Sequence, residues 1–164
     1  MGFILINLFA WLIFYSVFSI GYQKLPNFYF SVKSPLDGIF KERNFENKGK
    51  FWRQEFYVHR WKGYLPEGSN LFNINSQTEK PEKGLDLIKF QIMESKRSEL
   101  LHWSLIVISP YFFIWNPLWI GWAMIIFSVV TNGSFIIIQR FDRIRLCSIQ
   151  NRMENMIKKG AVFR

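Results

Sequence analysis

Two side chains suited to proton transfer stand at the entry to a long apolar segment. The segment E-S-K-R-S-E-L-L-H-W contains Glu94, Arg97, Glu99 and His102, and from there to Ile138 the sequence has no Lys, Arg, Asp or Glu. Residues three or four apart are neighbours on a helix, so Glu99 would lie beside His102 and Glu94 beside Arg97. A carboxylate that binds one imidazole nitrogen leaves the other able to accept a proton. The spacing therefore predicts a general base, His102, with Glu99 as its orienting partner.

The same residues also fit an anchoring role without chemistry. In that interpretation the charged residues form solvated ion pairs, while His102 and Trp103 hold the helix at the depth of the lipid headgroups. A helix that begins near Pro81 carries apolar residues at 85, 88 and 92, and the same stripe continues through Glu99 and His102. An unpaired polar group on a buried stripe costs about 1 to 3 kcal/mol. The stripe favours a chemical role and leaves the anchoring role open.

The apolar segments around this cluster are long enough to cross a bilayer. A spanning helix needs about 20 apolar residues, and the segment 3–20 meets that length. The second apolar block is too long for one crossing and is divided by Trp115-Asn116-Pro117 into 100–115 and 118–138. We therefore predict an all-α, small polytopic membrane protein with three transmembrane helices and interfacial amphipathic helices.

We predict a single membrane domain. The distribution of charge indicates on which side of the membrane its remaining segments lie. The formal net charge is +9, and the basic residues fall after the first span and after the last. Because cytoplasmic segments carry the excess of Lys and Arg, we predict a cytoplasmic aromatic-basic cap at 21–99 and a cytoplasmic amphipathic helix at 139–164. The hairpin 100–138 lies between them, and the N-terminus is outside the cell membrane. Within the cap we expect an amphipathic helix at 48–62 and a loop at 70–78.

Motifs of soluble enzymes, metal sites and nucleic-acid binding are missing from the sequence. There is no G-x-S-x-G, P-loop, G-x-G-x-x-G or Cys/His metal spacing, so we expect no metal and no resident cofactor. The basic residues flank apolar segments, which indicates membrane lipid and not nucleic acid as the partner. Cys147 is interpreted as a small apolar residue facing another helix and not as a nucleophile. Asn7 and Asn132, inside the predicted spans, are expected to bond between helices.

A series of polar blocks resembles one known family in order and spacing. The blocks are R-N-F-E-N-K-G-K-F-W at 43–52, F-Y-V-H-R-W-K at 56–62, L-P-E-G at 65–68, E-S-K-R-S-E-L-L-H-W at 94–103 and I-I-I-Q-R-F-D-R-I-R-L at 136–146. They are similar to the glycosyl-4,4'-diaponeurosporenoate acyltransferase family of staphyloxanthin-type carotenoid biosynthesis. The resemblance implies transfer of a long fatty acyl group from an acyl thioester, with acyl-CoA the expected co-substrate. The acceptor it implies is a sugar hydroxyl of a glycosylated polyene lipid or related glycolipid.

This chemistry assigns roles to the residues at the mouth of the membrane segment. An acyl thioester is already activated, so the enzyme needs a base for the alcohol and donors for the developing oxyanion. We assign His102 as the base, Glu99 as its partner, and Arg97, beside Glu94, or Trp103 as donors. Phosphates of the donor or of lipid headgroups would meet basic residues that otherwise serve as membrane anchors. These residues are Lys50, Arg53, Arg60, Lys62, Arg140, Arg143 and Arg145.

The rival hypothesis is a non-catalytic membrane adaptor or lipid-binding subunit. A catalytic protein should place Glu99 and His102 at a cavity open to lipid, whereas an adaptor should place them in water or in ion pairs. A methyltransferase or reductase would need a nucleotide pocket, and no motif indicates one. Since three spans make a thin bundle around a two-substrate site, a homo-oligomer is compatible with the sequence.

Overall fold

The computed structural model describes residues 2–31, 34–64 and 84–159, and these contain helices and no strand. The predicted all-α class is therefore confirmed for the described residues. The α-helices are α1 (Gly2–Lys24), α2 (Asp37–Phe40), α3 (Lys50–Gln54), α4 (Val58–Trp61), α6 (Leu85–Ile108) and α7 (Leu118–Lys158). Short 3-10 turns lie at η1 (Asn27–Phe30), η2 (Asn44–Gly49), η3 (Lys62–Tyr64) and η4 (Ser109–Ile114). The predicted loop at 70–78 lies outside the described residues.

The chain divides into two compact units. One unit joins Met1–Pro26 to Arg97–Ile136, and the other joins Asn27–Lys96 to Ile137–Arg164. The long helices α6 and α7 each contribute one part to each unit.

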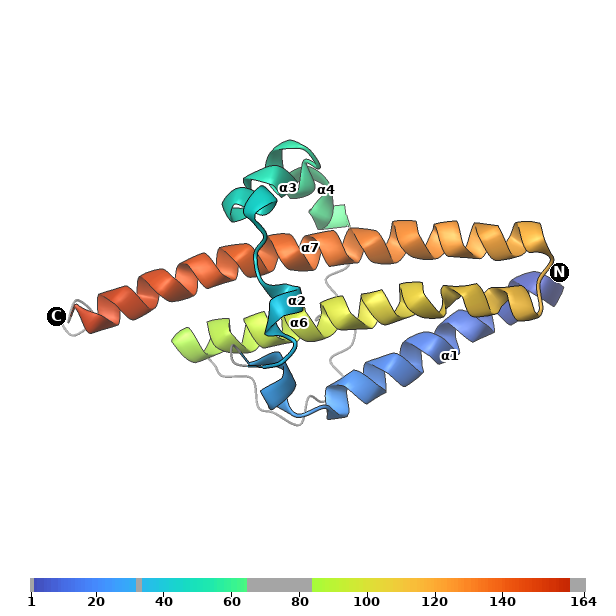
Figure 1. The fold of residues 1–164 in the computed structure, drawn as a ribbon, viewed down its shortest axis with the longest axis horizontal. Helices are drawn as coiled ribbons and strands as arrows, with labels where there is room; N and C mark the ends of the chain where they lie inside the picture. The colour runs from blue at the N-terminus through green and yellow to red at the C-terminus, as the bar shows by residue number, and fades with distance from the viewer. Residues whose placement is uncertain (1, 32–33, 65–83, 160–164) are drawn as a thin grey trace. The chain divides into compact units, whose positions relative to one another are not determined.

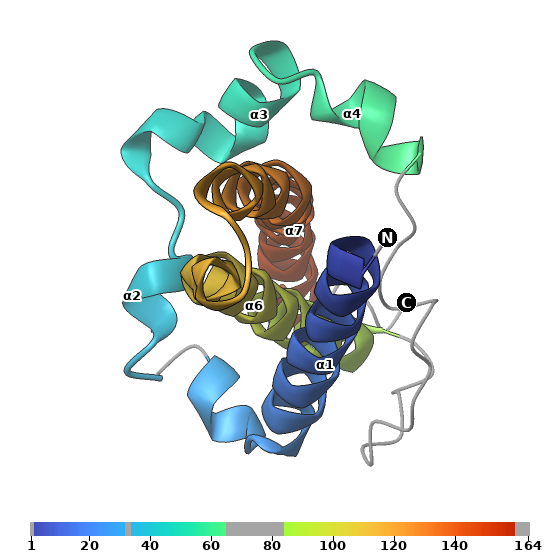
Figure 2. The same cartoon turned by 90° about the vertical axis from the view of Figure 1, so that its right-hand side faces the viewer.

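In the first unit, α1 lies beside the half of α6 that follows Arg97 (Figures 1 and 2). Asn7 of α1 exchanges hydrogen bonds of 3.1 and 2.8 Å with Asn116, and Trp115 Nε1 donates to Asn7 Oδ1 at 2.9 Å. Near the other end of α1, the Tyr22 hydroxyl is 2.5 Å from Ser104 Oγ. The prediction that Asn7 bonds to another helix is met only in part, because its partners Trp115 and Asn116 lie in the turn that precedes α7. A polar group in an apolar environment is satisfied here by other polar groups of the protein.

Among the described residues two helices, α1 and α7, are each long and apolar enough to cross a membrane. Both also leave large apolar side chains exposed, among them Phe9 at 64% and Trp119 at 73%. Of the three predicted spans, these two helices support those at 3–20 and 118–138. Over 100–115 the structure has the end of α6, which stops at Ile108, and then the 3-10 turn η4. Pro110 accounts for the change, because proline has no N–H to donate and clashes with the preceding helical turn.

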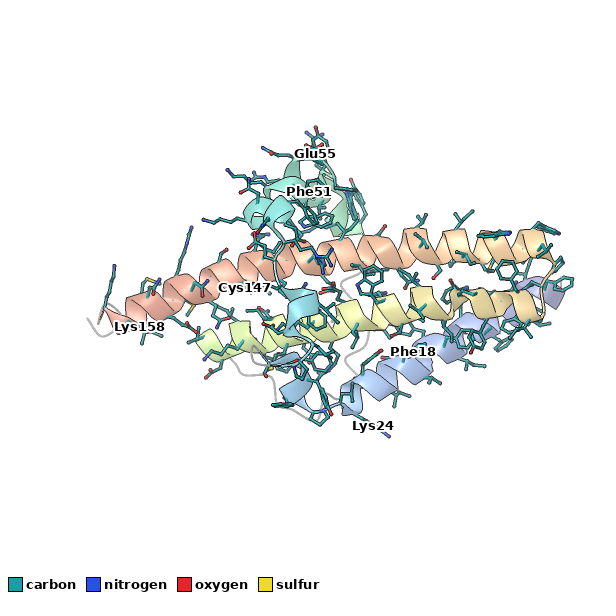
Figure 3. The ribbon with its side chains drawn as sticks, in the orientation of Figure 1. Phe18, Lys24, Phe51, Glu55, Cys147 and Lys158 are labelled. Atoms are coloured by element: carbon teal, nitrogen blue, oxygen red, sulfur yellow. The ribbon has the colours of Figure 1, made fainter. Side chains whose placement is uncertain are left out.

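In the second unit, α3 and α4 pack against α7 through their apolar and aromatic side chains. Trp52, Val58, Phe141 and Ile144 form its buried core, with Phe51, Trp61, Ile137 and Ile138 around them. Figure 3 shows Phe51 on the side of α3 toward α7 and Glu55 on the opposite side. Aromatic side chains of the predicted cap, such as Trp52, are therefore buried inside the protein and do not face lipid.

The predicted helix at 48–62 is wrong as a single element. The structure has two short helices there, α3 and α4, and α4 follows Tyr57, whose φ of 49° is left-handed. Such a φ interrupts a right-handed helix and is uncommon for a residue other than glycine. The segments 118–138 and 139–158, by contrast, form one uninterrupted helix, α7. The boundary predicted at 138 is the end of a membrane span, and the helix continues through it, as expected for Arg140, Arg143 and Arg145.

Candidate active site

His102 of α6 is held by two side chains of α7. It is buried, with 7% of its surface exposed, and its Nδ1 lies 2.9 Å from Asn132 Oδ1. Its ring stacks on Phe135, with the ring centroids 4.7 Å apart and the planes 4° from parallel. The hydrogen bond fixes the direction of the imidazole and the stacking fixes its plane. This contact also confirms the prediction that Asn132 bonds between helices.

The surroundings of Asn132 decide which ring nitrogen carries the proton. Asn132 Nδ2 donates to the backbone oxygen of Ser128 at 3.0 Å, and a carbonyl oxygen can only accept. The amide nitrogen must therefore face Ser128, and the amide oxygen must face His102. Nδ1 of His102 is consequently the donor, and in the neutral ring Nε2 is the unprotonated nitrogen that can accept a proton.

The same network returns to the helix that carries His102. Ser128 is fully buried, lies 3.3 Å from Asn132 Nδ2 through its Oγ, and donates from that oxygen to the backbone oxygen of Leu105 at 3.2 Å. The side chains of His102, Asn132 and Ser128 thus form a continuous hydrogen-bonded chain that begins and ends on α6. Such a chain restrains the rotation of each member, because any flip breaks a bond in a site with little water to replace it.

Glu99 occupies a different position from the one expected. It is fully buried, and its Oε1 accepts a hydrogen bond from Trp103 Nε1 at 3.4 Å. His102 donates its hydrogen bond to the Asn132 amide oxygen, so the orienting contact predicted for Glu99 is made by an amide on α7. Glu99 instead accepts a hydrogen bond from the indole of Trp103, the residue that follows His102 on α6.

An apolar groove of about 320 Å³ runs between α1 and α6 in the first unit. Its lining consists of Phe18, Leu100, Trp103, Ser104, Val107 and Ile108. Of the predicted site residues only Trp103 borders it; Glu99 and His102 do not line it. The groove has the character expected for a hydrocarbon chain, since its polar groups are few and Ser104 is bonded to Tyr22.

Two predicted phosphate-binding arginines, Arg140 and Arg143, are held by groups of the protein in the second unit. Arg140 donates to Glu46 Oε1 at 3.2 Å and to the backbone oxygen of Ile39 at 2.8 Å. Arg143 donates to Ser95 Oγ at 3.4 Å. Both side chains are buried, so here they fasten the segment around Glu46 and α6 to α7. A buried charge requires such partners, because desolvation without them is costly.

The other predicted substrate-binding residues are dispersed. In the second unit Lys62 forms an ion pair with Asp142 at 2.7 Å, the Arg60 guanidinium lies over the Tyr57 ring at 5.0 Å, and Glu94 is half-buried. Arg97, in the first unit, is buried and donates to the backbone oxygen of Leu25 at 3.4 Å. Arg53 is exposed and borders a basic pocket of about 370 Å³.

Cys147 is a poor candidate for a nucleophile. Burial raises the pKa of the Cys147 thiol, while Arg143 and Lys96 oppose that shift. A thiol with a raised pKa is protonated near neutral pH and is a poor nucleophile. In the described part of the chain no three His, Cys, Asp or Glu side chains gather where they could hold a metal ion.

Comparison with known proteins assigns the chain to a family. A family model described as glycosyl-4,4'-diaponeurosporenoate acyltransferase matches residues 37–152. The chain belongs to this acyltransferase family. Relatives that carry the same name in Staphylococcus aureus strains MRSA252 and USA300 are each 35% identical over 127 residues, which cover 77% of this chain and 74% of the relative. No solved structure matches the chain.

Membership of the acyltransferase family confirms the resemblance of the polar blocks. The matched range contains His102, its partner Asn132 and the groove residues of α6, whereas α1 precedes it. Sequence reasoning missed the link between His102 and Asn132, although it identified both residues. The available signal was Ser128 four residues before Asn132, a polar pair on one face of an otherwise apolar helix.

Proposed function

We propose that the protein transfers a long-chain fatty acyl group from an acyl thioester to a sugar hydroxyl of a glycosylated carotenoid or related glycolipid. The acceptor comes from the name that the relatives carry. The general base is His102, and the observation that carries this role is the hydrogen bond from its Nδ1 to Asn132. That bond leaves Nε2 as the proton acceptor in the neutral ring.

The reaction requires one proton to move from the sugar hydroxyl to His102 and then from His102 to the departing sulfur. As the sugar oxygen bonds to the thioester carbonyl carbon, its proton passes to Nε2 of His102 and negative charge develops on the carbonyl oxygen. When the tetrahedral intermediate collapses, the C–S bond breaks and the imidazolium returns the proton to the departing sulfur. Nδ1 keeps its proton throughout, so the bond to Asn132 serves both charge states without rearrangement.

Donors for the oxyanion are available on the same helix. Trp103 Nε1 makes a long bond of 3.4 Å to Glu99, and a long bond is easily exchanged for a stronger one to an oxyanion. The guanidinium of Arg97 is the second donor. Hydrogen bonds that strengthen as charge develops lower the barrier selectively.

The hydrocarbon parts of both substrates fit the apolar surfaces of the protein. The groove beside Trp103 would hold one chain, and the exposed apolar side chains of α1 and α7 would face lipid. In this proposal 100–115 forms a third, short crossing in the cell membrane. The N-terminus is outside and the C-terminus is cytoplasmic, where thioester donors are made.

A second candidate, a lipid-binding subunit without catalysis, is favoured by one observation. The groove is lined by Trp103 but by neither Glu99 nor His102, as expected for a site that binds a chain without acting on it. In that case binding of a glycolipid would need no acyl donor.

Reconstitution tests the two functions directly. Purified protein in lipid nanodiscs, mixed with a long-chain acyl-CoA and a glycosylated diaponeurosporenoate, should form a product heavier than the acceptor by one fatty acid minus water. Mass spectrometry of the extracted lipids detects that product. Binding of the glycolipid without any product would favour the lipid-binding subunit.

A further inference from the structure

A concave basic pocket lies entirely within the second unit. Its volume is about 370 Å³, within the usual range for small-molecule sites. Residues of η2, α3, α4 and α7 contribute to its wall, and they are Lys48, Gly49, Lys50, Arg53, His59, Phe141 and Arg145. The lining thus combines permanently charged cations, a histidine and one aromatic ring, and includes no acidic residue.

Within the described residues, most of these cations are not neutralised by a carboxylate. Among the described residues no carboxylate pairs with the side chains of Lys48, Lys50 or Arg53. Arg145 has Asp142 at 3.9 Å, but Asp142 lies closer to Lys62, at 2.7 Å. Neighbouring cations in one concave wall repel one another, and an anion in the pocket would relieve that repulsion.

The backbone that forms one edge of the pocket is unusual. Asn47, Lys48 and Gly49 are consecutive left-handed residues, with φ of 43°, 53° and 82°. Left-handed φ at a residue other than glycine costs of order 1 kcal/mol, so this turn must be held by its surroundings. The turn brings Lys48 and Lys50 to the same pocket. Gly49 packs there against α7, and a Cβ atom added to it would lie 3.8 Å from the Phe141 ring.

One buried aromatic ring completes the wall of the pocket. Phe141 borders the pocket, and the cations of Lys62 and Arg145 lie over its ring at 5.6 and 5.8 Å. Arginine and lysine together bind phosphate oxygens by charge-assisted hydrogen bonds. A carboxylate ligand would need fewer cations, and a purely apolar ligand would need none.

We propose that this pocket binds the phosphate groups of a nucleotide-type acyl thioester, the coenzyme A class of donor. This assignment rests on the proposed function, because it supplies the donor that the acyl transfer requires. Lys50 and Arg53, both on α3, are the principal phosphate ligands, and Lys48, His59 and Arg145 complete the charge around them. An anionic lipid headgroup presents the same phosphate chemistry, so the test separates the two sources.

The test compares variants that lose equal charge from different places. Lys50→Gln with Arg53→Gln removes two cations from the pocket, and Lys158→Gln with Lys159→Gln removes two exposed cations near the end of α7 (Figure 3). Coenzyme A is titrated into each protein in nanodiscs of phosphatidylcholine, at low and at high salt. Binding to phosphatidylglycerol vesicles is measured in parallel.

The pocket variant should bind coenzyme A at least about tenfold more weakly than the wild type, since it loses two charge-assisted hydrogen bonds. The control should match the wild type, and high salt should weaken wild-type binding. Equal affinities in all proteins, or no binding to the wild type, would overturn the proposal. A loss confined to phosphatidylglycerol vesicles would overturn it in favour of a lipid headgroup.

A truncated donor separates this inference from the proposed function. An acyl-pantetheine thioester has no phosphate, so the pocket variant and the wild type should transfer its acyl group at equal rates. If the wild type transfers acyl groups from this donor while coenzyme A binds all proteins alike, the pocket assignment is wrong and the acyltransferase function stands. If the wild type transfers from no thioester, the proposed function is wrong whatever coenzyme A binding shows.

Discussion

The amide of Asn132 fixes the imidazole of His102 in one tautomer. Its Oδ1 accepts from His102 Nδ1 at 2.9 Å, because its Nδ2 is committed to the backbone oxygen of Ser128 at 3.0 Å. Asn132 thus performs the task that an aspartate performs in many hydrolases, with a neutral acceptor suited to an apolar environment. The geometry makes the base on α6 dependent on a residue of α7.

Replacement of Asn132 should therefore distinguish orientation from mere polarity. Asn132→Leu removes the acceptor, so both tautomers form and acyl transfer should fall by about 10- to 100-fold, part of the range for general-base catalysis. Asn132→Asp keeps an acceptor for Nδ1 and should retain more activity than the leucine variant. Steady-state rates with equal amounts of inserted protein measure the difference. Equal loss in the two variants would argue against tautomer control.

Glu99 should matter less than His102. Its carboxylate contacts Trp103 at 3.4 Å and is not the hydrogen-bond partner of His102. Glu99→Gln keeps an oxygen that can accept from the indole, so we expect a loss of less than about tenfold, below the usual range for removing a general base. The rate of product formation in nanodiscs measures this. A loss as large as that of a His102 variant would show that Glu99 takes part in proton transfer.

The two ends of the chain should be on opposite sides of the membrane. Single cysteines placed at residues 2 and 158, in a Cys147→Ser background, can be labelled in intact cells with an impermeant maleimide. The N-terminal cysteine should react, and the C-terminal one should react only after the membrane is opened. Because burial raises the pKa of Cys147, the native thiol should itself react slowly near pH 7. Rapid labelling of residue 158 in intact cells would overturn the topology.

Two glycines of α7 provide a matched test of packing in the first unit. A Cβ at Gly121 would lie 2.2 Å from the Phe113 ring, whereas one at Gly133 would meet nothing within 4 Å. Gly121→Ala should destabilise the protein by about 1 to 3 kcal/mol, because the ring must shift. Gly133→Ala should be neutral or slightly stabilising, since alanine favours a helix. Thermal unfolding in detergent compares them, and equal effects would contradict the close approach at Gly121.

Local patterns predicted the first long helix well and the hydrogen-bond partners of buried side chains poorly. Apolar length predicted a first helix at 3–20, and α1 is Gly2–Lys24. Polarity inside apolar segments predicted that Asn7 and Asn132 bond between helices. The partner of His102 was predicted from neighbours on its own helix, but Asn132 is 30 residues away. Which face of α7 meets α6 depends on the packing of both helices. Residue spacing along one helix therefore cannot predict this contact.

In the cap, too, the local sequence did not predict the ion-pair partner of a buried arginine or the backbone turn before α4. Arg140 was interpreted as a ligand for phosphates, yet it is buried in an ion pair with Glu46, which lies 94 residues away in the sequence. The break before α4 depends on the left-handed Tyr57, which tertiary packing stabilises: Val58 is fully buried and Trp61 Nε1 donates to the Phe56 oxygen at 2.8 Å. No residue type in this stretch indicates such a turn, because tyrosine rarely adopts it.

The most direct test of the account is the turnover of His102→Gln in nanodiscs with acyl-CoA and a glycosylated carotenoid. Glutamine keeps polarity and approximate size and can still bond to Asn132, but it cannot accept the proton of the sugar hydroxyl. Loss of general-base catalysis predicts a fall of about 10²- to 10⁴-fold while the variant inserts and unfolds like the wild type. Wild-type turnover by His102→Gln would show that His102 only anchors its helix, and would contradict its role as the base.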